Sequence, residues 1–384
     1  MQRNTPRQQV PIPEKYLRAT TAELRRMVLA RKEQLGEDLC ILGHHYQSDE
    51  VIEFADLTGD SLKLSQLAAR QDRAKYIVFC GVHFMAESAD VLSSDEQIVI
   101  LPNAQAGCAM ADMADADGAA AAMDELSAIS DGARIVPITY VNSSAAIKAL
   151  TGRSGGACCT SGNVRNVFEW ALAPQADGGG GAGKLLCIPD QHLARNTAAA
   201  MGYGDDDCAI YDPALPNGGL SAEDVARATF LLWKGFCYVH QKFTPDQIAA
   251  VRQQHPGVRV IVHPECPREV VRLADAAGST EQIIRAVQQA PDGGKWAIGT
   301  ESNLVKRLAK RFDNQFICVL SDAPALCMTM HLVDLPHLLW VLDNLADGRV
   351  VNQVIVEPDD ARDAKVALDR MIAIKAVRDV TKGR

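Results

Sequence analysis

Two segments of this chain carry the same polar landmarks at the same spacing, and this repeat limits what the chain can fold into. Each landmark of the first segment recurs 219 positions later in the second. The matched pairs are Tyr46 and Glu265, Ser61 and Thr280, and Cys108 and Cys327. A repeat at a fixed offset indicates that one structural unit occurs more than once along the chain.

Each of the two segments begins with a short apolar run, at residues 39–42 and at residues 258–262. Runs of this length are typical of buried strands, and the helical patterns that follow predict alternating strands and helices. Polar side chains come directly after both runs: His44 and Tyr46 in the first, His263 and Glu265 in the second. Proteins with parallel sheets bind ligands at this end of their strands.

We interpret the middle of the chain as a third copy of the repeated unit, longer than the other two. Its landmarks are Tyr140 and Asn142 after a strand, Ser161 before a helix, and Cys237 after a late strand. Ser161 and Cys237 are 76 positions apart, whereas the matching interval in the other copies is 47. The glycine-rich stretch 178–183 and a Gly-, Asp- and Pro-rich insertion over residues 203–220 can absorb the excess.

The three copies predict an α/β fold with three similar three-layer α/β domains around a pseudo-threefold axis. Such an arrangement would bring the three cysteines and the three polar sets to one central site. The expected divisions are an N-terminal arm and helix (1–35), a first α/β domain with Cys108 (36–132), a second with the insertion and Cys237 (133–256), a third with Cys327 (257–345), and a C-terminal helical closing segment (346–384).

Local patterns predict particular elements within this frame. Residues 1–16 are polar and are expected to form a disordered arm. A charged amphipathic helix is expected over residues 21–35, capped by Thr20 or Thr21 with Glu23 in its first turn. Further helices are expected over residues 50–57, 62–70, 222–232 and 268–276.

Composition excludes several classes of protein. The formal net charge is −9, which argues against a nucleic-acid footprint. The N-terminal residues have no apolar core of a secretory signal, and no apolar run approaches the length of a membrane span. Eleven cysteines without an export signal favour reduced thiols and a cytoplasmic protein.

Only the positions of three cysteines within the repeat indicate that they could bind a metal centre. No CxxC motif occurs, so any metal ligands must come from distant parts of the sequence. Three thiolates from three domains could hold a [4Fe–4S] cluster and leave its fourth iron open as a Lewis acid. The alternative is that Cys108, Cys237 and Cys327 are small buried hydrophobes. The vicinal pair Cys158 and Cys159 could be redox-active, or simply packed in the core.

The polar landmarks also allow two interpretations. Glu265 suits a general acid or base, yet a carboxylate at a strand end also serves in structural hydrogen bonds. The Ser and Thr residues at helix starts could bind an anion with the free backbone N–H groups there, or could be plain helix caps. Those residues are Ser61, Ser161 and Thr280.

Read together and in order, these stretches resemble the quinolinate synthase family, the A protein of bacterial NAD biosynthesis. The resemblance covers about residues 36–345. It rests on eight motifs: Gly43-His44-His45-Tyr46-Gln47, Gly59-Asp60-Ser61-Leu62, Gly107-Cys108-Ala109-Met110-Ala111-Asp112-Met113, Tyr140-Val141-Asn142-Ser143-Ser144, Cys159-Thr160-Ser161-Gly162-Asn163, Gly235-Phe236-Cys237-Tyr238-Val239-His240, His263-Pro264-Glu265-Cys266-Pro267 and Gly278-Ser279-Thr280.

The resemblance implies one [4Fe–4S] cluster per chain, held by Cys108, Cys237 and Cys327. It implies a transferase that condenses iminoaspartate with dihydroxyacetone phosphate to quinolinate, releasing phosphate and two waters. L-aspartate oxidase or aspartate dehydrogenase would be the pathway neighbour that supplies iminoaspartate. The residues implied to line the cavity are His44, Tyr46, Tyr140, Asn142, His263 and Glu265, and those implied to hold carboxylate or phosphate groups are Ser61, Ser161 and Thr280.

On this interpretation the open iron polarises a substrate oxygen while Glu265 and Tyr46 move protons, assisted by His44 and His263. Two departures from the family pattern stand out: the lengthened middle domain, and a last cysteine, Cys327, that lies outside any CxxCxxC run. Two alternatives from other classes remain, an iron–sulfur redox regulator and a metal-free phosphosugar lyase.

Overall fold

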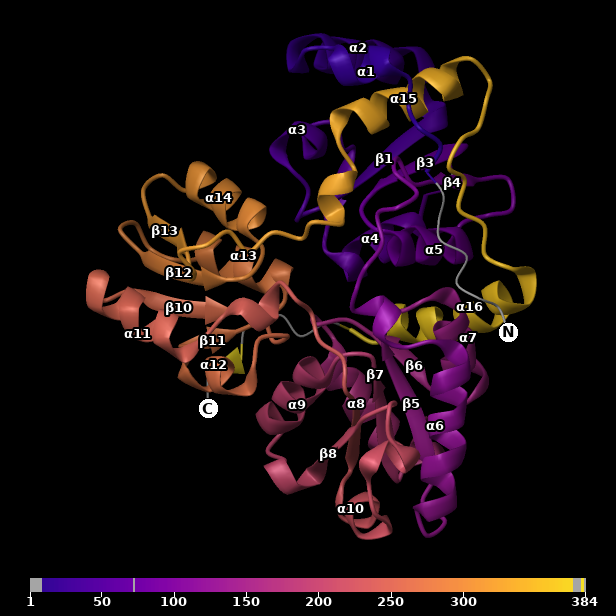
Figure 1. Cartoon of the computed structure of the whole chain (residues 1–384), viewed down its shortest axis with the longest axis vertical. Helices are drawn as coiled ribbons and strands as arrows, with labels where there is room; N and C mark the ends of the chain where they lie inside the picture. Colours follow the sequence, from indigo (N-terminus) through magenta and orange to yellow (C-terminus); the bar gives the residue numbers. More distant parts are fainter. Residues whose placement is uncertain (1–8, 72, 376–380, 383–384) are drawn as a thin grey trace. The chain divides into compact units, whose positions relative to one another are not determined.

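The computed structural model describes residues 9–71, 73–375 and 381–382 (Figure 1). The chain divides into two compact units. The first comprises residues 1–108 and 327–357, and the second comprises residues 109–326 and 358–384. The first unit contains one sheet and the second contains two.

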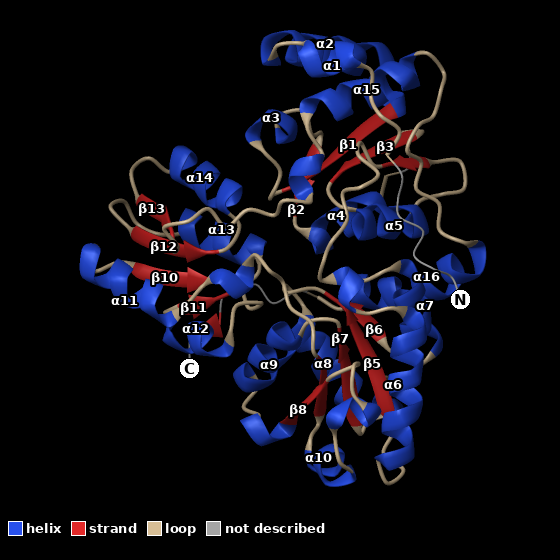
Figure 2. Ribbon diagram, in the orientation of Figure 1, coloured by secondary structure: helices blue, strands red, loops and turns tan. Residues whose placement is uncertain are grey.

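The first unit is built on a four-stranded parallel sheet with strand order β2-β1-β3-β4. Helices lie on both faces of this sheet, so the unit has three layers (Figure 2). The strands are β1 (Leu39–His44), β2 (Leu57–Gly59), β3 (Tyr76–Cys80) and β4 (Ile98–Ile100). The helices are α1 (Glu14–Arg18), α2 (Thr21–Leu35), α3 (Asp49–Ile52), α4 (Ser61–Ala68), α5 (His83–Leu92) and α15 (Leu335–Ala346), with the 3₁₀ helices η1 (Gly36–Asp38) and η7 (Met330–Leu332).

The second unit contains a five-stranded parallel sheet with strand order β6-β5-β7-β9-β8. Its strands are β5 (Ile135–Tyr140), β6 (Ala157–Cys159), β7 (Lys184–Ile188), β8 (Cys208–Tyr211) and β9 (Phe230–Trp233). The helices around it are α6 (Ala116–Ile129), α7 (Ala145–Arg153), α8 (Val164–Leu172), α9 (Gln191–Ala200), α10 (Ala222–Arg227) and α16 (Pro358–Ala373), with η2 (Ala111–Met113), η3 (Gln175–Asp177), η4 (Asp205–Asp207), η5 (Pro216–Gly219) and η6 (His240–Lys242).

The other sheet of the second unit has strand order β13-β12-β10-β11-β14. Its first four strands are parallel, and β14 pairs antiparallel with β11 at the edge. The strands are β10 (Arg259–Val262), β11 (Ala276–Ala277), β12 (Lys295–Gly299), β13 (Phe316–Val319) and β14 (Thr381–Lys382). The flanking helices are α11 (Pro245–Gln254), α12 (Arg268–Leu273), α13 (Thr280–Gln288) and α14 (Ser302–Arg311).

The 219-residue repeat is visible in the elements themselves. Strand β12 and helix α14 begin and end 219 positions after β3 and α5, and the strand orders β2-β1-β3-β4 and β11-β10-β12-β13 correspond. The middle sheet repeats this order as β6-β5-β7-β9, with β8 added at one edge. The α/β prediction with three mainly parallel sheets is therefore confirmed. The pseudo-threefold axis and the five divisions of the chain stay predictions.

One predicted helix was wrong over half its length. Residues 222–232 form α10 only as far as Arg227, and β9 follows at Phe230–Trp233. These four residues are fully buried in the middle of a parallel sheet. A strand that is apolar on both faces shows no alternation, so its sequence cannot be told from the end of a helix.

Two other helices were predicted too long for a related reason. The helix expected over residues 50–57 ends at Ile52, and Leu57 opens β2. The helix expected over residues 268–276 ends at Leu273, and Ala276 opens β11. Strands of two or three residues are too short to carry a periodicity of their own.

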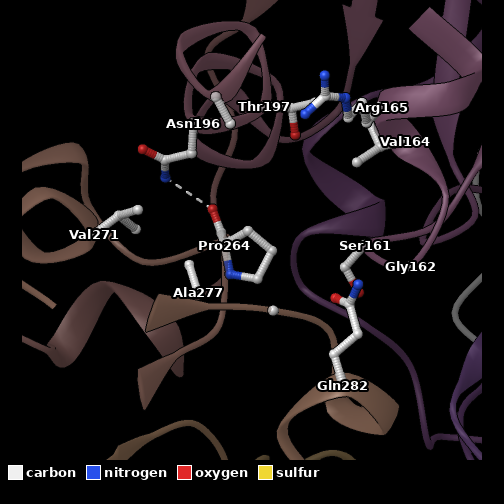
Figure 3. A pocket seen from close by; sticks show the side chains of 12 residues that line it. Ser161, Gly162, Val164, Arg165, Asn196, Thr197, Pro264, Val271, Ala277 and Gln282 are labelled. Carbon is white, nitrogen blue, oxygen red and sulfur yellow. Dashed lines mark hydrogen bonds between the residues drawn. The ribbon is translucent and has the colours of Figure 1, made fainter. Parts of the chain in front are cut away.

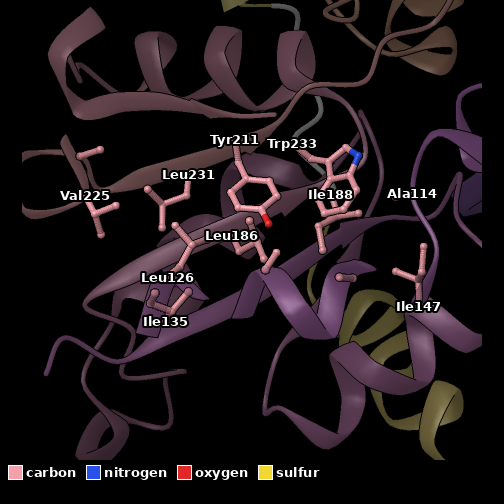
Figure 4. Packing of buried hydrophobic residues seen from close by; sticks show 13 residues of the cluster. Ala114, Leu126, Ile135, Ile147, Leu186, Ile188, Tyr211, Val225, Leu231 and Trp233 are labelled. Carbon is pink, nitrogen blue, oxygen red and sulfur yellow. The ribbon is translucent and has the colours of Figure 1, made fainter. Parts of the chain in front are cut away.

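The insertion over residues 203–220 contributes to the core of the second unit. It holds β8, whose Tyr211 packs beside Trp233 with ring centroids 5.5 Å apart. Both side chains belong to a buried cluster that includes Leu126, Leu186 and Leu231 (Figure 4). The insertion thus widens the middle sheet by one strand and buries an aromatic side chain against it.

At the N-terminus, helix α2 confirms the prediction for residues 21–35, and its cap is Thr20 rather than Thr21. Thr20 and Glu23 form a capping box, in which each side chain accepts from the backbone N–H of the other. The predicted disordered arm was wrong for residues 14–16, which belong to α1; residues 1–8 lie outside the described part of the chain. Within the described residues, no helix has the length and apolar character needed to cross a membrane.

Candidate active site

The three cysteines of the repeat occupy equivalent positions in their local backbone. Cys108, Cys237 and Cys327 each lie in a loop, and each is followed by two turn residues and a 3₁₀ helix that begins three residues further on. Those 3₁₀ helices are η2, η6 and η7. The same backbone arrangement three times over supports the equivalence that the repeat predicted.

These three thiols also differ from most of the others in the chain. All eleven cysteines are described, and none forms a disulfide. Cys108, Cys237 and Cys327 are half-buried and lie outside the strands, whereas six others are buried. The remaining half-buried thiols, Cys208 and Cys318, lie in strands, where burial raises the pKa of each. Cys158 and Cys159 are buried in or beside β6 with raised pKa values, as core thiols are.

Within the second unit, residues close in sequence to the other two cysteines are held by hydrogen bonds, and one of them, Met113, is bonded to the chain just before Cys237. Met113, five residues after Cys108, accepts at its carbonyl from the indole N–H of Trp233 and at its sulfur from the backbone N–H of Phe236. Ala325, two residues before Cys327, exchanges hydrogen bonds with Ser302 at the start of α14. Both contacts therefore anchor residues that follow or precede a predicted ligand.

Glu265 lies at the centre of the polar residues of the second unit. Its side chain is 3% exposed, and its Oε2 atom lies 2.8 Å from His240 Nδ1 and 3.1 Å from His263 Nδ1. The two imidazole rings stack at 4.3 Å between centroids. Burial alone would raise the pKa of Glu265, but the two histidines outweigh it and hold that pKa below its usual range.

Two neighbouring groups have pKa values shifted by the same surroundings. Burial, and then the charge of His240, lower the pKa of His263. Burial, and then the charge of Glu265, raise the pKa of Asp190 well above its usual range. Two carboxyl groups with pKa values moved in opposite directions are the pattern expected of an acid and a base that work together.

The loop that carries Glu265 is held from both sides by α9. The amide nitrogen of Asn196 donates to the carbonyl of Pro264 at 2.8 Å, the residue before Glu265 (Figure 3). It also donates to the carbonyl of Cys266 at 2.9 Å, the residue after Glu265. The thiol of Cys266 donates to the carbonyl of Gly299 in β12. The carboxylate is thereby fixed on a loop that is tied to two elements.

Ser161 is brought to this group by the second unit. Its hydroxyl lies 3.2 Å from Nε2 of His263. Ser161 also lines a cavity of about 50 Å³ whose wall includes Arg165, Asn196, Pro264 and Gln282 (Figure 3). A cavity of this size with several polar groups can hold ordered water. Ser161, His263 and Glu265 thus form one polar chain, with successive side-chain distances of 3.2 and 3.1 Å.

The structure shows which residues cap helices α4 and α13, a point that the sequence left open. Asp60 caps α4 by accepting from the N–H of Lys63, and Ser279 caps α13 by accepting from the N–H of Gln282. Ser61 and Thr280 are the first residues of these helices and not their caps. Ser161 lies three residues before α8, ahead of a helix as the sequence indicated.

In the first unit the structure brings His44 and Tyr46 together. Their rings meet edge to face at 4.7 Å, and the N–H of Tyr46 donates to His44 Nδ1 at 3.2 Å. The N–H of Glu265 makes the same contact with Nδ1 of His263 at 3.3 Å. The two polar strand tips therefore share one local conformation, as the 219-residue register predicted.

The remaining predicted residues lie at the end of β5. Tyr140 is its last residue and is buried, and Asn142 follows in the next turn. The side-chain oxygen of Asn142 is buried without a hydrogen-bond partner among the described residues. A buried acceptor in this state is uncommon unless a ligand or water completes it.

Sequence reasoning assigned no role to three residues that the structure places here: Asp190, Asn196 and His240. The signal for His240 was its position three residues after Cys237, a spacing common to many metal ligands. The signal for Asp190 was its place directly after β7, where a parallel sheet presents functional groups. Asn196 gave none, because helical asparagines are common.

Repeated α/β units with buried acid–base groups at their strand ends define this chain as an α/β enzyme. It matches the family model of quinolinate synthetase A protein over residues 26–373. The chain belongs to the quinolinate synthase family, which confirms the resemblance seen in the sequence.

Similar proteins agree with this assignment. The chain is 51% identical to the quinolinate synthase of Streptomyces coelicolor over 348 residues, 90% of this chain and 86% of that protein. It is 47% identical to that of Corynebacterium glutamicum over 378 residues, 98% and 94% of the two chains. It is 49% identical to that of Geobacillus kaustophilus over 366 residues, 94% and 96%.

Proposed function

We propose that this enzyme condenses iminoaspartate with dihydroxyacetone phosphate to quinolinate in the de novo synthesis of NAD. Phosphate and two waters leave, and the overall conversion is redox-neutral. Membership of the quinolinate synthase family supports this proposal. The observation that carries it within the structure is the common backbone around Cys108, Cys237 and Cys327.

The donor set fits a [4Fe–4S] cluster. Cluster ligands must be thiols that can reach an inorganic centre, and these three form no disulfide, are half-buried and lie outside the strands. We assign Cys108, Cys237 and Cys327 as the ligands of one cluster. When bound, such a cluster supplies an iron without a protein ligand that polarises a substrate oxygen.

The acid–base work falls to residues of the chain. Glu265 is ionised at neutral pH because its pKa is lowered, so its carboxylate can accept a proton from substrate. His263 keeps that carboxylate in place at 3.1 Å and passes a hydrogen bond on to Ser161. We assign Tyr46, oriented by its contact with His44, as the second proton-transfer group.

Binding of the substrate's charged groups falls to the helix starts. Ser61 and Thr280 are first residues of α4 and α13, and their neighbours already cap those helices. Their place in the first turn of a helix suits a carboxylate or phosphate. We assign Ser61, Ser161 and Thr280 to these anions. The buried oxygen of Asn142, with Tyr140 beside it, suits a donor group on the substrate.

The supply of substrate follows from its chemistry. Iminoaspartate is an oxidised form of aspartate, so an L-aspartate oxidase or an aspartate dehydrogenase would produce it. Both the reduced state of the eleven cysteines and an oxygen-sensitive cluster suit the cytoplasm.

The direct test is an anaerobic assay with the two substrates. Protein reconstituted with iron and sulfide is expected to form quinolinate and phosphate in equal amounts. Protein that lacks iron and sulfide is expected to be inactive. Activity without iron would favour a metal-free lyase, and a redox-active cluster without quinolinate formation would favour a regulator; either result would overturn the proposal.

A further inference from the structure

A thiol, an imidazole and a carboxylate meet in the second unit without help from the first. Ligand atoms of Cys237, His240 and Glu265 all lie within 4.8 Å of one another. Cysteine, histidine and glutamate are the ligand types of zinc sites, and three protein ligands leave a fourth position for water. We propose that the cluster-free protein binds a single divalent cation of the zinc class through these three residues.

The spacing of the three atoms is close to what such an ion requires. With bonds of about 2.0 Å to nitrogen or oxygen and about 2.3 Å to sulfur, tetrahedral ligand atoms lie roughly 3.3–3.6 Å apart. His240 Nδ1 and Glu265 Oε2 are 2.8 Å apart, so this pair must open by roughly 0.5 Å to hold an ion. The ligand atoms all lie within 4.8 Å of one another, so the sulfur of Cys237 has to approach the other two by at most on the order of 1 Å. Cys237 is half-buried and lies in a loop, so its side chain can supply that movement.

The surroundings hold the two buried ligands as metal sites usually hold theirs. The second ring nitrogen of His240, Nε2, lies 3.1 Å from the hydroxyl of Thr300, which is fully buried. A hydrogen bond on the far side of the ring fixes the orientation of a ligating histidine. Glu265 is fixed by His263 and by the clamp of Asn196 on its loop.

The carboxylate of Glu265 shows a specific gap in its contacts. Its Oε1 atom is buried and has no hydrogen-bond partner among the described residues. A buried carboxylate normally has both oxygens engaged, because an unsatisfied one costs free energy. A cation bound by this carboxylate would satisfy that oxygen.

The ligand set also selects the kind of ion. Mg²⁺ and Ca²⁺ prefer oxygen ligands, whereas a thiolate and an imidazole favour zinc and the later transition metals. Only Cys237 is shared with the cluster proposed above. The inference does not depend on that cluster, because neither Cys108 nor Cys327 takes part.

Cobalt(II) is the probe, since it occupies zinc sites and reports a thiolate ligand by its absorption. The full chain, prepared anaerobically without iron and sulfide, is expected to bind one equivalent of Co²⁺. A thiolate-to-cobalt charge-transfer band and visible ligand-field bands should appear and should vanish when Zn²⁺ is added. Cys237→Ser should abolish the charge-transfer band, and Cys208→Ser, which alters another half-buried thiol of this unit, should not.

Four further variants complete the test. His240→Asn and Glu265→Gln should each weaken Co²⁺ binding at least about tenfold, and Thr300→Val, which removes the orienting contact, by roughly 10–100-fold. The double variant Cys108→Ser/Cys327→Ser should bind Co²⁺ as the unaltered protein does, although it should fail to build the cluster. This variant separates failure of the inference from failure of the proposed function.

The contradicting results are equally specific. The inference is wrong if Co²⁺ binds with no thiolate band, if Cys237→Ser keeps that band, or if the double variant loses binding. Circular dichroism of each variant shows whether it is folded. Should Cys237→Ser fail to fold, unchanged Co²⁺ affinity in both His240→Asn and Glu265→Gln overturns the inference on its own.

Discussion

At the scale of single residues, Glu265 is the group on which the proposed acid–base chemistry depends. It is buried, yet two facing histidines keep it ionised against the cost of burial. The neighbouring Asp190 is shifted the other way by burial and by the charge of Glu265. The pair can therefore hold one proton between two carboxyl groups over a wide range of pH.

Glu265→Gln keeps the size of this side chain and removes its ability to accept a proton. We expect kcat for quinolinate formation to fall by roughly 10²–10⁴, the range usual for loss of a general base. Iron and sulfide content should be unchanged, because the thiolates are untouched. Glu269→Gln makes the same change on an exposed position of α12 and should leave the rate as it was. A Glu265→Gln enzyme with near-normal kcat would remove Glu265 from the mechanism.

Asp90 of α5 offers a test of electrostatics away from the site. Burial, with a smaller contribution from Glu87, raises its pKa, although its carboxylate accepts from the N–H of Val356 at 2.9 Å. A raised pKa in the folded state means that ionised Asp90 opposes folding. Its contribution to stability is therefore full below the ordinary value of 3.8 and is lost as pH rises through the folded pKa.

Asp90→Asn keeps an acceptor for Val356 and removes the charge. We expect the variant to gain on the order of 0.5 kcal/mol in the free energy of unfolding at neutral pH, and the gain to shrink towards pH 3.8. Denaturant unfolding of both proteins at several pH values measures this. A gain that stays constant with pH, or a loss at neutral pH, would show that the charge of Asp90 is not the cause.

At the scale of elements, the 219-residue register could be found from the sequence because its landmarks lie beside strand and helix ends. Strand β3 and helix α5 recur at the matching positions as β12 and α14. Strands β2, β9 and β11 could not be found, because they are short or buried on both faces and show no alternation. The contact of His240 with Glu265 could not be predicted either, because no local sequence pattern connects two residues that are 25 positions apart.

The clamp between α9 and the loop of Glu265 is an element-scale device that can be tested. Asn196→Asp keeps the shape but cannot donate to the carbonyls of Pro264 and Cys266. We expect a loss of about 1–3 kcal/mol in the free energy of unfolding, because buried acceptors lose their donor. The rate of quinolinate formation should also fall, by about tenfold or more, because Glu265 is no longer held in place.

Asn166→Asp is the matched control, because Asn166 donates from an exposed position on α8. It should change neither stability nor rate appreciably. If Asn196→Asp lowers stability but leaves kcat and KM unaltered, the clamp is structural and does not position Glu265.

At the scale of the whole molecule, two of the three cysteines, Cys108 and Cys327, mark where the chain passes between its two compact units. The first unit ends at Cys108 and resumes at Cys327, and Cys237 belongs to the second. Each of the three cysteines lies in a loop with the same backbone pattern. A fold built from repeated units can provide such loops to bind one shared cluster. Family membership and this pattern together make the proposed cluster the central claim of the account.

The most direct test compares Cys327→Ser with Cys318→Ser, its nearest rival in the sequence. Cys318 lies within β13 and has a pKa raised by burial. After anaerobic purification and reconstitution, Cys318→Ser is expected to keep its iron, its sulfide, its visible absorption and its quinolinate formation. Cys327→Ser is expected to lose all four. A Cys327→Ser protein with full iron content and full activity would contradict the ligand assignment and, with it, the proposed mechanism.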